Sequence, residues 1–183
     1  MVKDLKEIIE LPEQVQVILE GYNITVKGPK GEITKKMVDP MIKVDIDDKK
    51  IIIDFNKKIK QNKKSKMILN TFKAHLKTMI KGVREGYEYK LKICSGHFPM
   101  SVGIEGEEVI IKNFLGERVP RKAKIVKGVK VDIKGDIIIL QGIDKEAVGT
   151  CAGRIELATK ISNRDRRIFQ DGIFLMEKAG KKL

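Results

Sequence analysis

The sequence has little of several residue types that common functional sites require. It contains no Trp, two Cys and two His, and aromatic residues make up 5% of its 183 residues. Cys94 and Cys151 lie far apart, in neither disulfide nor zinc-cluster spacing, so we expect two small buried hydrophobic residues in a reducing compartment. The scarcity of aromatic residues argues against a module that binds single-stranded nucleic acid on an aromatic sheet surface.

Long hydrophobic runs are absent as well. No apolar run approaches the roughly 20 residues that a membrane-spanning helix needs. The N-terminal segment Met1–Glu7 lacks the apolar block of a secretion signal. We therefore expect a cytoplasmic protein without a membrane partner.

No motif indicates a catalytic or cofactor site. The sequence has no Gly-rich loop that ends in Lys-Ser or Lys-Thr before a helix, which excludes a P-loop. Cys94 and His97 have a metal-like spacing but no second pair, and neither histidine has a visible Ser or Cys partner for a triad. We expect no enzyme activity, no cofactor and no metal.

Positive charge is present in excess. The net charge is +13 and the isoelectric point is near 9.6. Basic residues predominate in three stretches, Phe55–Arg84, Lys112–Lys130 and Arg154–Leu183. Cationic patches spread in this way predict several contacts with one large nucleic acid, and they suit the phosphates and 2′-hydroxyls of folded, double-helical RNA.

The chain contains an internal repeat at an offset of 85 residues. The matched segments are Val17–Gly21 with Val102–Gly106, Lys27–Glu32 with Lys112–Glu117, and, with a drift of one or two residues, Val44–Ile46 with Val131–Ile133 and Ile51–Ile53 with Ile137–Ile139. A repeat of this length predicts two packed modules of one architecture.

Alternation of apolar and polar residues predicts strands in both copies. The expected strands are Gln14–Glu20, Tyr22–Lys27, Glu32–Met37, Ile42–Ile46 and Ile51–Phe55, then Tyr87–Cys94, Val109–Lys112, Arg118–Ile125, Val129–Ile133 and Ile137–Gln141. A helical period follows each set, from Ile68 to Gly82, where Gly82 is expected to end the helix, and after Asp144, a candidate N-cap.

These patterns predict an α+β fold of two duplicated modules, each an antiparallel sheet with one helix packed on a face, plus a basic C-terminal tail. The expected boundaries are 1–82, 83–163 and 164–183. In the tail, Asp171-Gly172 is expected to form a turn and Ile173–Leu175 a short edge strand.

Two segments are the strongest candidates for RNA contact. Three arginines within four positions, Arg164, Arg166 and Arg167, can make bidentate contacts with phosphates. The loop Lys112–Lys122 is also basic, although an ordinary solvated hairpin is an equally good interpretation for any single lysine in it.

Several motifs resemble the archaeal and eukaryotic branch of the ribosomal protein L6 family of the large subunit. The motif Arg164-x-x-Arg167-x-Phe169-x-Asp171-Gly172 resembles a signature of that branch, which usually has Tyr where Phe174 stands. Positions 70–83, 97–100, 113–117 and 142–152 carry further resemblance, so the similarity extends through nearly the whole chain.

The resemblance implies a structural, non-catalytic protein of cytoplasmic ribosomes that binds large-subunit rRNA and adjoins other large-subunit proteins. In the family, the second domain and tail lie near the sarcin-ricin loop and the factor-binding region, where translational GTPases dock. The candidate rRNA-binding residues are Asn113, Phe114, Gly116, Arg118, Arg121, Lys122, Arg164, Arg166, Arg167, Phe169, Asp171, Gly172, Lys178, Lys181 and Lys182. Of these, Arg166, Lys178, Lys181 and Lys182 rest on charge alone.

Two other functions are alternatives to this interpretation. An RNA-modifying or RNA-cleaving enzyme would need a paired acid and base or a cofactor loop. A free-standing regulatory module for DNA or mRNA would prefer particular short sequences and stay soluble outside ribosomes. The sequence leaves open whether the Lys-rich helix between residues 63 and 81 faces RNA, protein or solvent.

Overall fold

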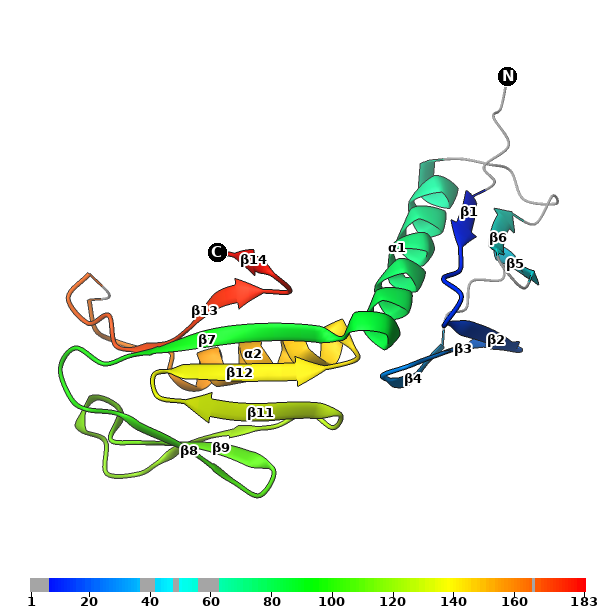
Figure 1. Cartoon of the computed structure of the whole chain (residues 1–183). Coiled ribbons are helices and arrows are strands. Elements are labelled where there is room, and N and C mark those ends of the chain that lie inside the picture. The colour runs from blue at the N-terminus through cyan, green and yellow to red at the C-terminus, as the bar shows by residue number, and fades with distance from the viewer. Residues whose placement is uncertain (1–6, 37–41, 48–49, 56–62, 166) are drawn as a thin grey trace. The chain divides into compact units, whose positions relative to one another are not determined.

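A computed structural model describes residues 7–36, 42–47, 50–55, 63–165 and 167–183. The chain divides into two compact units, Met1–Gly86 and Tyr87–Leu183 (Figure 1). Each unit contains antiparallel strands and one α-helix, so the predicted α+β class is confirmed. Within each unit the strands divide into two sheets, where the sequence pattern suggested one.

The N-terminal unit has two three-stranded sheets and a long helix. One sheet has the order β1 (Glu7–Glu10), β6 (Lys50–Phe55), β5 (Ile42–Asp47), and the other β2 (Gln16–Glu20), β3 (Asn23–Gly28), β4 (Gly31–Lys36). Helix α1 (Lys63–Glu85) packs against strands of both sheets. Its buried stripe includes Leu69, Phe72, Leu76 and Met79, as the 3.6-residue period predicts.

Helix α1 extends beyond Gly82, where it was expected to end. Gly82 is buried within the helix, and the left-handed residue is Gly86, whose N–H donates to the Gly82 carbonyl at 2.8 Å. Val83 is fully buried, and its side chain packs against Gly28. Burial of Val83 outweighs the cost of about 1 kcal/mol for a glycine inside a helix.

The C-terminal unit has a five-stranded sheet, a three-stranded sheet and a shorter helix. The five-stranded sheet has the order β11 (Val129–Lys134), β12 (Ile137–Gly142), β7 (Tyr87–Cys94), β13 (Gly172–Lys178), β14 (Lys181–Lys182), and the other sheet β10 (Arg121–Lys124), β9 (Glu108–Lys112), β8 (Ser101–Glu105). Helix α2 (Lys145–Ala158) packs against strands of both sheets. Tyr89, Leu91, Ile138, Leu140, Val148 and Ile155 form the centre of the core.

Most strands agree with the sequence pattern within two residues at each end, apart from Met37, which lies outside the described ranges. The strand expected over Arg118–Ile125 begins only at Arg121. The residue before it, Pro120, has no N–H to donate to a ladder. Strands β1, β8 and β14 were not expected, and the Glu-Ile-Ile-Glu pattern of β1 does not alternate.

The segment predicted as a separate tail completes the five-stranded sheet. Strand β13 is antiparallel to β7, with Gly172 opposite Cys94 and Ile173 opposite Ile93. On its other side, β14 pairs with β13 through Lys181 and Lys182. Over Ile173–Leu175, which were expected to form an edge strand, β13 pairs with β7 alone, because β14 pairs only with Glu177 and Lys178. Ile173 is nevertheless fully buried.

Candidate nucleic-acid interface

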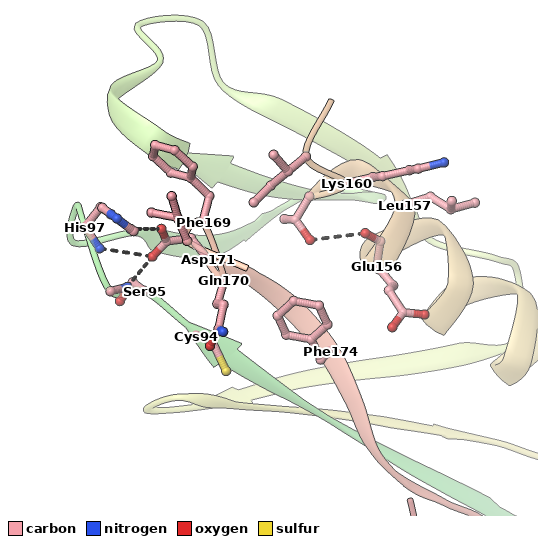
Figure 2. Close-up of a pocket in the computed structure, with 14 residues that line it drawn as sticks. Cys94, Ser95, His97, Glu156, Leu157, Lys160, Phe169, Gln170, Asp171 and Phe174 are labelled. Atoms are coloured by element: carbon pink, nitrogen blue, oxygen red, sulfur yellow. Dashed lines mark hydrogen bonds and ion pairs between the residues drawn. The ribbon is translucent and has the colours of Figure 1, made fainter. Parts of the chain in front are cut away.

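Asp171 anchors the segment between α2 and β13. It was expected to form a turn with Gly172, but Gly172 begins strand β13, and Asp171 is 4% exposed. Its carboxylate accepts hydrogen bonds from the backbone N–H of Gly96, from the His97 N–H at 3.1 Å and from His97 Nδ1 at 2.5 Å (Figure 2). Burial alone would raise the pKa of Asp171, but these hydrogen bonds together hold it below its ordinary value. Asp171 therefore fixes the arginine-rich segment to the loop that follows β7.

A stack of three side chains lies on this anchor. The rings of His97 and Phe169 have centroids 4.8 Å apart and an interplanar angle of 24°. The guanidinium carbon of Arg164 lies 4.9 Å from the Phe169 centroid. The Phe169 ring thus contacts both His97 and Arg164. The stack orients the Arg164 guanidinium by a cation–π contact.

Arg167 is exposed and is oriented by Asp165. Its Nε and Nη2 donate to the Asp165 carboxylate at 3.1 and 2.8 Å, and its N–H donates to Asp165 Oδ1 at 2.9 Å. These hydrogen bonds lower the pKa of Asp165, so the carboxylate is ionised at neutral pH. The third arginine of the cluster, Arg166, lies outside the described residues.

A pocket of about 940 Å³ opens beside the anchored segment (Figure 2). It is lined by residues of the β7 end, of the α2 end and of the segment leading into β13, among them Ser95, Glu156, Leu157, Lys160, Ile168, Gln170 and Phe174. Thr159, at the α2 end, is buried and accepts a hydrogen bond from the Ile173 N–H at 2.9 Å. This bond joins β13 to the helix and fixes one wall of the pocket.

The loop between β9 and β10 has a compact fold of its own. Asn113 is left-handed and its side chain donates to the Pro99 carbonyl at 2.9 Å. Gly116 has φ +79°, and a Cβ there would lie 3.7 Å from the Phe98 ring. Phe114 was expected to contact RNA, but it is buried in the core of the C-terminal unit. Its place in the structure makes it the attachment point of the loop.

Arg121 connects this loop to the end of α2. Its guanidinium lies 4.3 Å from the Phe114 ring centroid and forms a two-bond pair with Glu117 at 2.7 and 2.6 Å. It also donates to the carbonyls of Ala158 and Lys160 at 2.9 and 3.2 Å. The hydrogen bonds from Arg121 lower the pKa of Glu117. Because all these contacts are with other groups of the protein, we assign Arg121 a supporting role: it holds the loop in place.

The structure separates the candidate residues into exposed cations and supporting groups. Among the candidate residues in the described ranges, the exposed cations are Arg118, Lys122, Arg164, Arg167, Lys178, Lys181 and Lys182. Lys122 lies 3.5 Å from Glu108. The supporting groups are Phe114, Arg121, Phe169, Asp171 and Gly172.

Sequence reasoning assigned no role to His97, Lys160 or Thr159. His97 belongs to a segment that carried the family resemblance, and this was its only signal. Its contacts to Asp171 and Phe169 span more than 70 residues of sequence, so no local pattern could reveal them.

In the N-terminal unit, α1 carries a separate group of lysines. Lys63, Lys64, Lys66 and Lys77 are exposed. Lys73 forms an ion pair with Glu7, and Lys81 lies 3.9 Å from Glu85. The positive charge of this Lys-rich helix is thus partly neutralised by carboxylates of the same unit. Lys57, Lys58 and Lys60 lie outside the described residues.

No group of three or more His, Cys, Asp or Glu residues in the described ranges could hold a metal ion. None of the helices there combines the length and hydrophobicity needed to cross a membrane.

Comparison with known proteins gives consistent matches over the chain. The family model described as "Ribosomal protein L6" matches residues 11–86 and 98–172. Three archaeal proteins named "Large ribosomal subunit protein uL6" are similar to the chain. That of Methanobrevibacter smithii is 44% identical, with 95% of this chain and 96% of its own length covered. The protein of Methanococcus vannielii is 43% identical, with 98% of this chain and 97% of its own length covered. The protein of Methanosarcina mazei is 44% identical, with 98% of this chain and 100% of its own length covered.

Proposed function

The chain belongs to the ribosomal protein L6 family, and we propose that its C-terminal unit binds large-subunit rRNA near the sarcin-ricin loop and the factor-binding region. It is a structural, non-enzymatic constituent of the large subunit of cytoplasmic ribosomes. Neighbouring large-subunit proteins adjoin it, and translational GTPases dock close by. The family resemblance supports the location, and the arrangement of cations in the C-terminal unit supports the mode of binding.

The observation that carries the proposal is the rigid mounting of two exposed arginines. Arg164 stacks on Phe169, and Arg167 is held by Asp165. The segment that contains them is fixed by the buried Asp171. A guanidinium that is already oriented loses little conformational entropy when it binds a phosphate in bidentate geometry.

Further cations extend this surface along the same unit. Lys178, Lys181 and Lys182 are exposed on β13 and β14, and Arg118 and Lys122 are exposed beside the β9–β10 loop. Asn113 and Gly116 shape that loop, and Arg166 adds charge to the cluster. Phosphate neutralisation at several points makes binding steeply dependent on salt.

Binding of the full-length protein to large-subunit rRNA between 50 and 200 mM salt tests the proposal. We expect the double variant Arg164→Glu and Arg167→Glu to lose at least about tenfold in affinity. The slope of log affinity against log salt should fall by about 0.7–0.9 for each lost phosphate contact. The matched control, Lys66→Glu with Lys77→Glu on α1, changes the net charge equally. Equal losses in both variants would contradict a binding surface that is specific to the C-terminal unit.

Chemical footprinting of the same complexes tests the location. The wild-type protein should protect nucleotides at and beside the sarcin-ricin loop, and the arginine double variant should lose this protection. Protection confined to other parts of the rRNA would contradict the location.

A further inference from the structure

Three large apolar side chains are exposed around the pocket of the C-terminal unit. Leu157 on α2 is 66% exposed, Ile168 is 64% exposed and Phe174 on β13 is 40% exposed, and all three line the same hollow. Exposed apolar residues scattered singly are ordinary, but several gathered at one concave site indicate a binding surface. Covering them removes apolar surface from water, which is favourable.

Phe174 offers a flat surface at this pocket. A Cβ on Gly172 would lie 2.9 Å from Phe174 Cζ, so the ring rests against the bare glycine backbone. This contact holds the ring in place and explains why a glycine precedes it. The neighbouring ring of Phe169 already makes contacts with both His97 and Arg164. Phe174 is thus the aromatic lining residue that has surface available for a partner (Figure 2).

The charges at the pocket favour a nucleotide as the partner. Lys160 lines the pocket, and Arg164 and Arg167 belong to the segment beside it. These cations suit the phosphates on either side of an inserted base. Inside the pocket, Gln170 and Ser95 can donate or accept hydrogen bonds, and the Glu156 carboxylate can accept from an exocyclic amino group. The other lining carboxylate, Asp171, is already bound to Gly96 and His97.

We propose that this pocket receives one unpaired nucleobase of the rRNA, which stacks on Phe174 and is flanked by Leu157 and Ile168. This inference rests on the proposed function, and it specifies an unpaired base as one group that the RNA-binding surface recognises. One aromatic platform accepts one base turned out of a folded RNA, and this agrees with a chain too poor in aromatic residues to bind a long single strand.

Affinity measurements with Phe174 variants test the proposal. Phe174→Leu keeps an apolar side chain over Gly172 but removes the stacking face, so we expect about a tenfold loss of rRNA affinity. The salt slope should not change, because no phosphate contact is lost. Phe174→Tyr should bind like the wild type. Thermal unfolding followed by circular dichroism checks that both variants fold. Wild-type affinity in the folded Phe174→Leu variant would overturn the base pocket.

The two proposals can fail separately. If the arginine double variant loses affinity with a reduced salt slope while Phe174→Leu does not, the phosphate surface stands and the base pocket falls. If the arginine variant binds like the wild type, the proposed surface itself falls.

Photocrosslinking in assembled ribosomes identifies the occupant directly. The photoreactive analogue p-benzoylphenylalanine replaces Phe174, and in a matched control it replaces Ile104, which is 41% exposed in the same unit and lies outside this pocket. We expect position 174 to form an adduct with one rRNA nucleotide that position 104 does not form. An adduct with a ribosomal protein would show that the pocket docks a protein segment. That result, or the absence of a specific adduct, would overturn the proposal.

Discussion

The two copies of the repeat join corresponding strands in different ways. In the N-terminal unit, β3 and β4 are joined by the tight turn Pro29-Lys30, with Gly28 opposite Gly31. In the C-terminal unit, β9 and β10 are joined by residues 113–120, which contain a 3₁₀ turn and the buried Phe114. The copies keep the same hairpin and differ in the length of its connection.

Both hairpins nevertheless contact the C-terminal end of their own helix. The Lys30 N–H donates to the Val83 carbonyl of α1 at 3.0 Å. In the other unit, the Arg121 side chain donates to the Ala158 carbonyl at the end of α2 at 2.9 Å. The last carbonyls of a helix lack partners within it, so each unit supplies a donor from its hairpin. The duplication preserved this capping function with different donors. Lys30 supplies both its backbone N–H and its Nζ, which donates to the Glu85 carbonyl, whereas Arg121 supplies its guanidinium.

The larger difference lies beside β1 and β7, which pair with corresponding strands β6 and β12. Among the described residues, β1 pairs with β6 alone, whereas β7 lies between β12 and β13. Strand β13 and the segment leading to it bring Asp171, Phe174 and the arginines to the end of β7. The proposed RNA surface is therefore built where the C-terminal copy departs from the repeat, on a core that both copies share.

Among the substitutions that distinguish the two units, the removal of the Phe114 ring should have the largest effect on stability. We expect Phe114→Ala to lower the free energy of unfolding of the C-terminal unit by about 3–5 kcal/mol, because a large buried ring is replaced by a cavity. The N-terminal unit has no counterpart and should be unaffected. Native-state hydrogen exchange measured by mass spectrometry reports the two units separately. An equal loss of protection in both units would show that they unfold together.

Glycine-to-alanine changes should affect the two units alike. A Cβ on Gly28 would lie 2.8 Å from Val83 Cγ2, and one on Gly142 would lie 2.7 Å from Val148 Cγ2. In each unit a glycine at a strand end thus allows a helix valine to approach closely. We expect each substitution to destabilise its own unit by about 1–3 kcal/mol. Gly103→Ala is the control, because a Cβ there meets nothing within 4 Å. Destabilisation by Gly103→Ala of the same size would rule out the steric explanation.

Substitution of Asp171 tests the anchor that is specific to the C-terminal unit. Asp171→Asn weakens hydrogen bonds to Gly96 and His97, and we expect a loss of about 1–2 kcal/mol at neutral pH. The folded-state pKa of Asp171 lies below the ordinary value of 3.8. Its stabilisation is therefore fully present above that value and is lost as the pH falls through the folded-state pKa.

Thermal unfolding followed over a pH series measures this contribution. The stability difference between the wild type and Asp171→Asn should shrink as the pH falls below 3.8. Asp132→Asn removes an exposed carboxylate of the same unit and serves as the control. A difference that is independent of pH would mean that the carboxylate charge contributes nothing.

Local patterns made most of the fold predictable. Alternation located the strands, and Asp144 is the N-cap of α2, where its carboxylate accepts from the Glu146 N–H at 3.1 Å. Such features depend on neighbours in sequence. Gly82 was misleading because the burial of Val83, a tertiary effect, decided where α1 ends.

The sequence predicted which cations belong to the candidate site, but it did not predict how they are arranged and supported in space. The arginine cluster is visible in the sequence, but its support comes from Gly96 and His97, which are 75 and 74 residues from Asp171. Phe114 and Asp171 carried the family resemblance, and the structure places both inside the protein. A sequence motif of a family can thus indicate a binding surface even when some of its residues are buried and only support that surface.

The smallest expected effect concerns the two helix-capping connections. Arg121→Ala removes the cation–π contact with Phe114, the pair with Glu117 and the bonds to the α2 carbonyls, so we expect a loss of about 1 kcal/mol from the C-terminal unit. Lys30→Ala leaves the backbone bond to Val83 in place and removes only the exposed bond from Nζ to the Glu85 carbonyl, so it should cost at most about 0.5 kcal/mol. Hydrogen exchange at the last turn of each helix measures both. If Lys30→Ala opened the end of α1 as much as Arg121→Ala opened the end of α2, the Lys30 Nζ bond would matter as much as the Arg121 bonds, and the expectation that the backbone bond to Val83 suffices for the N-terminal cap would be wrong.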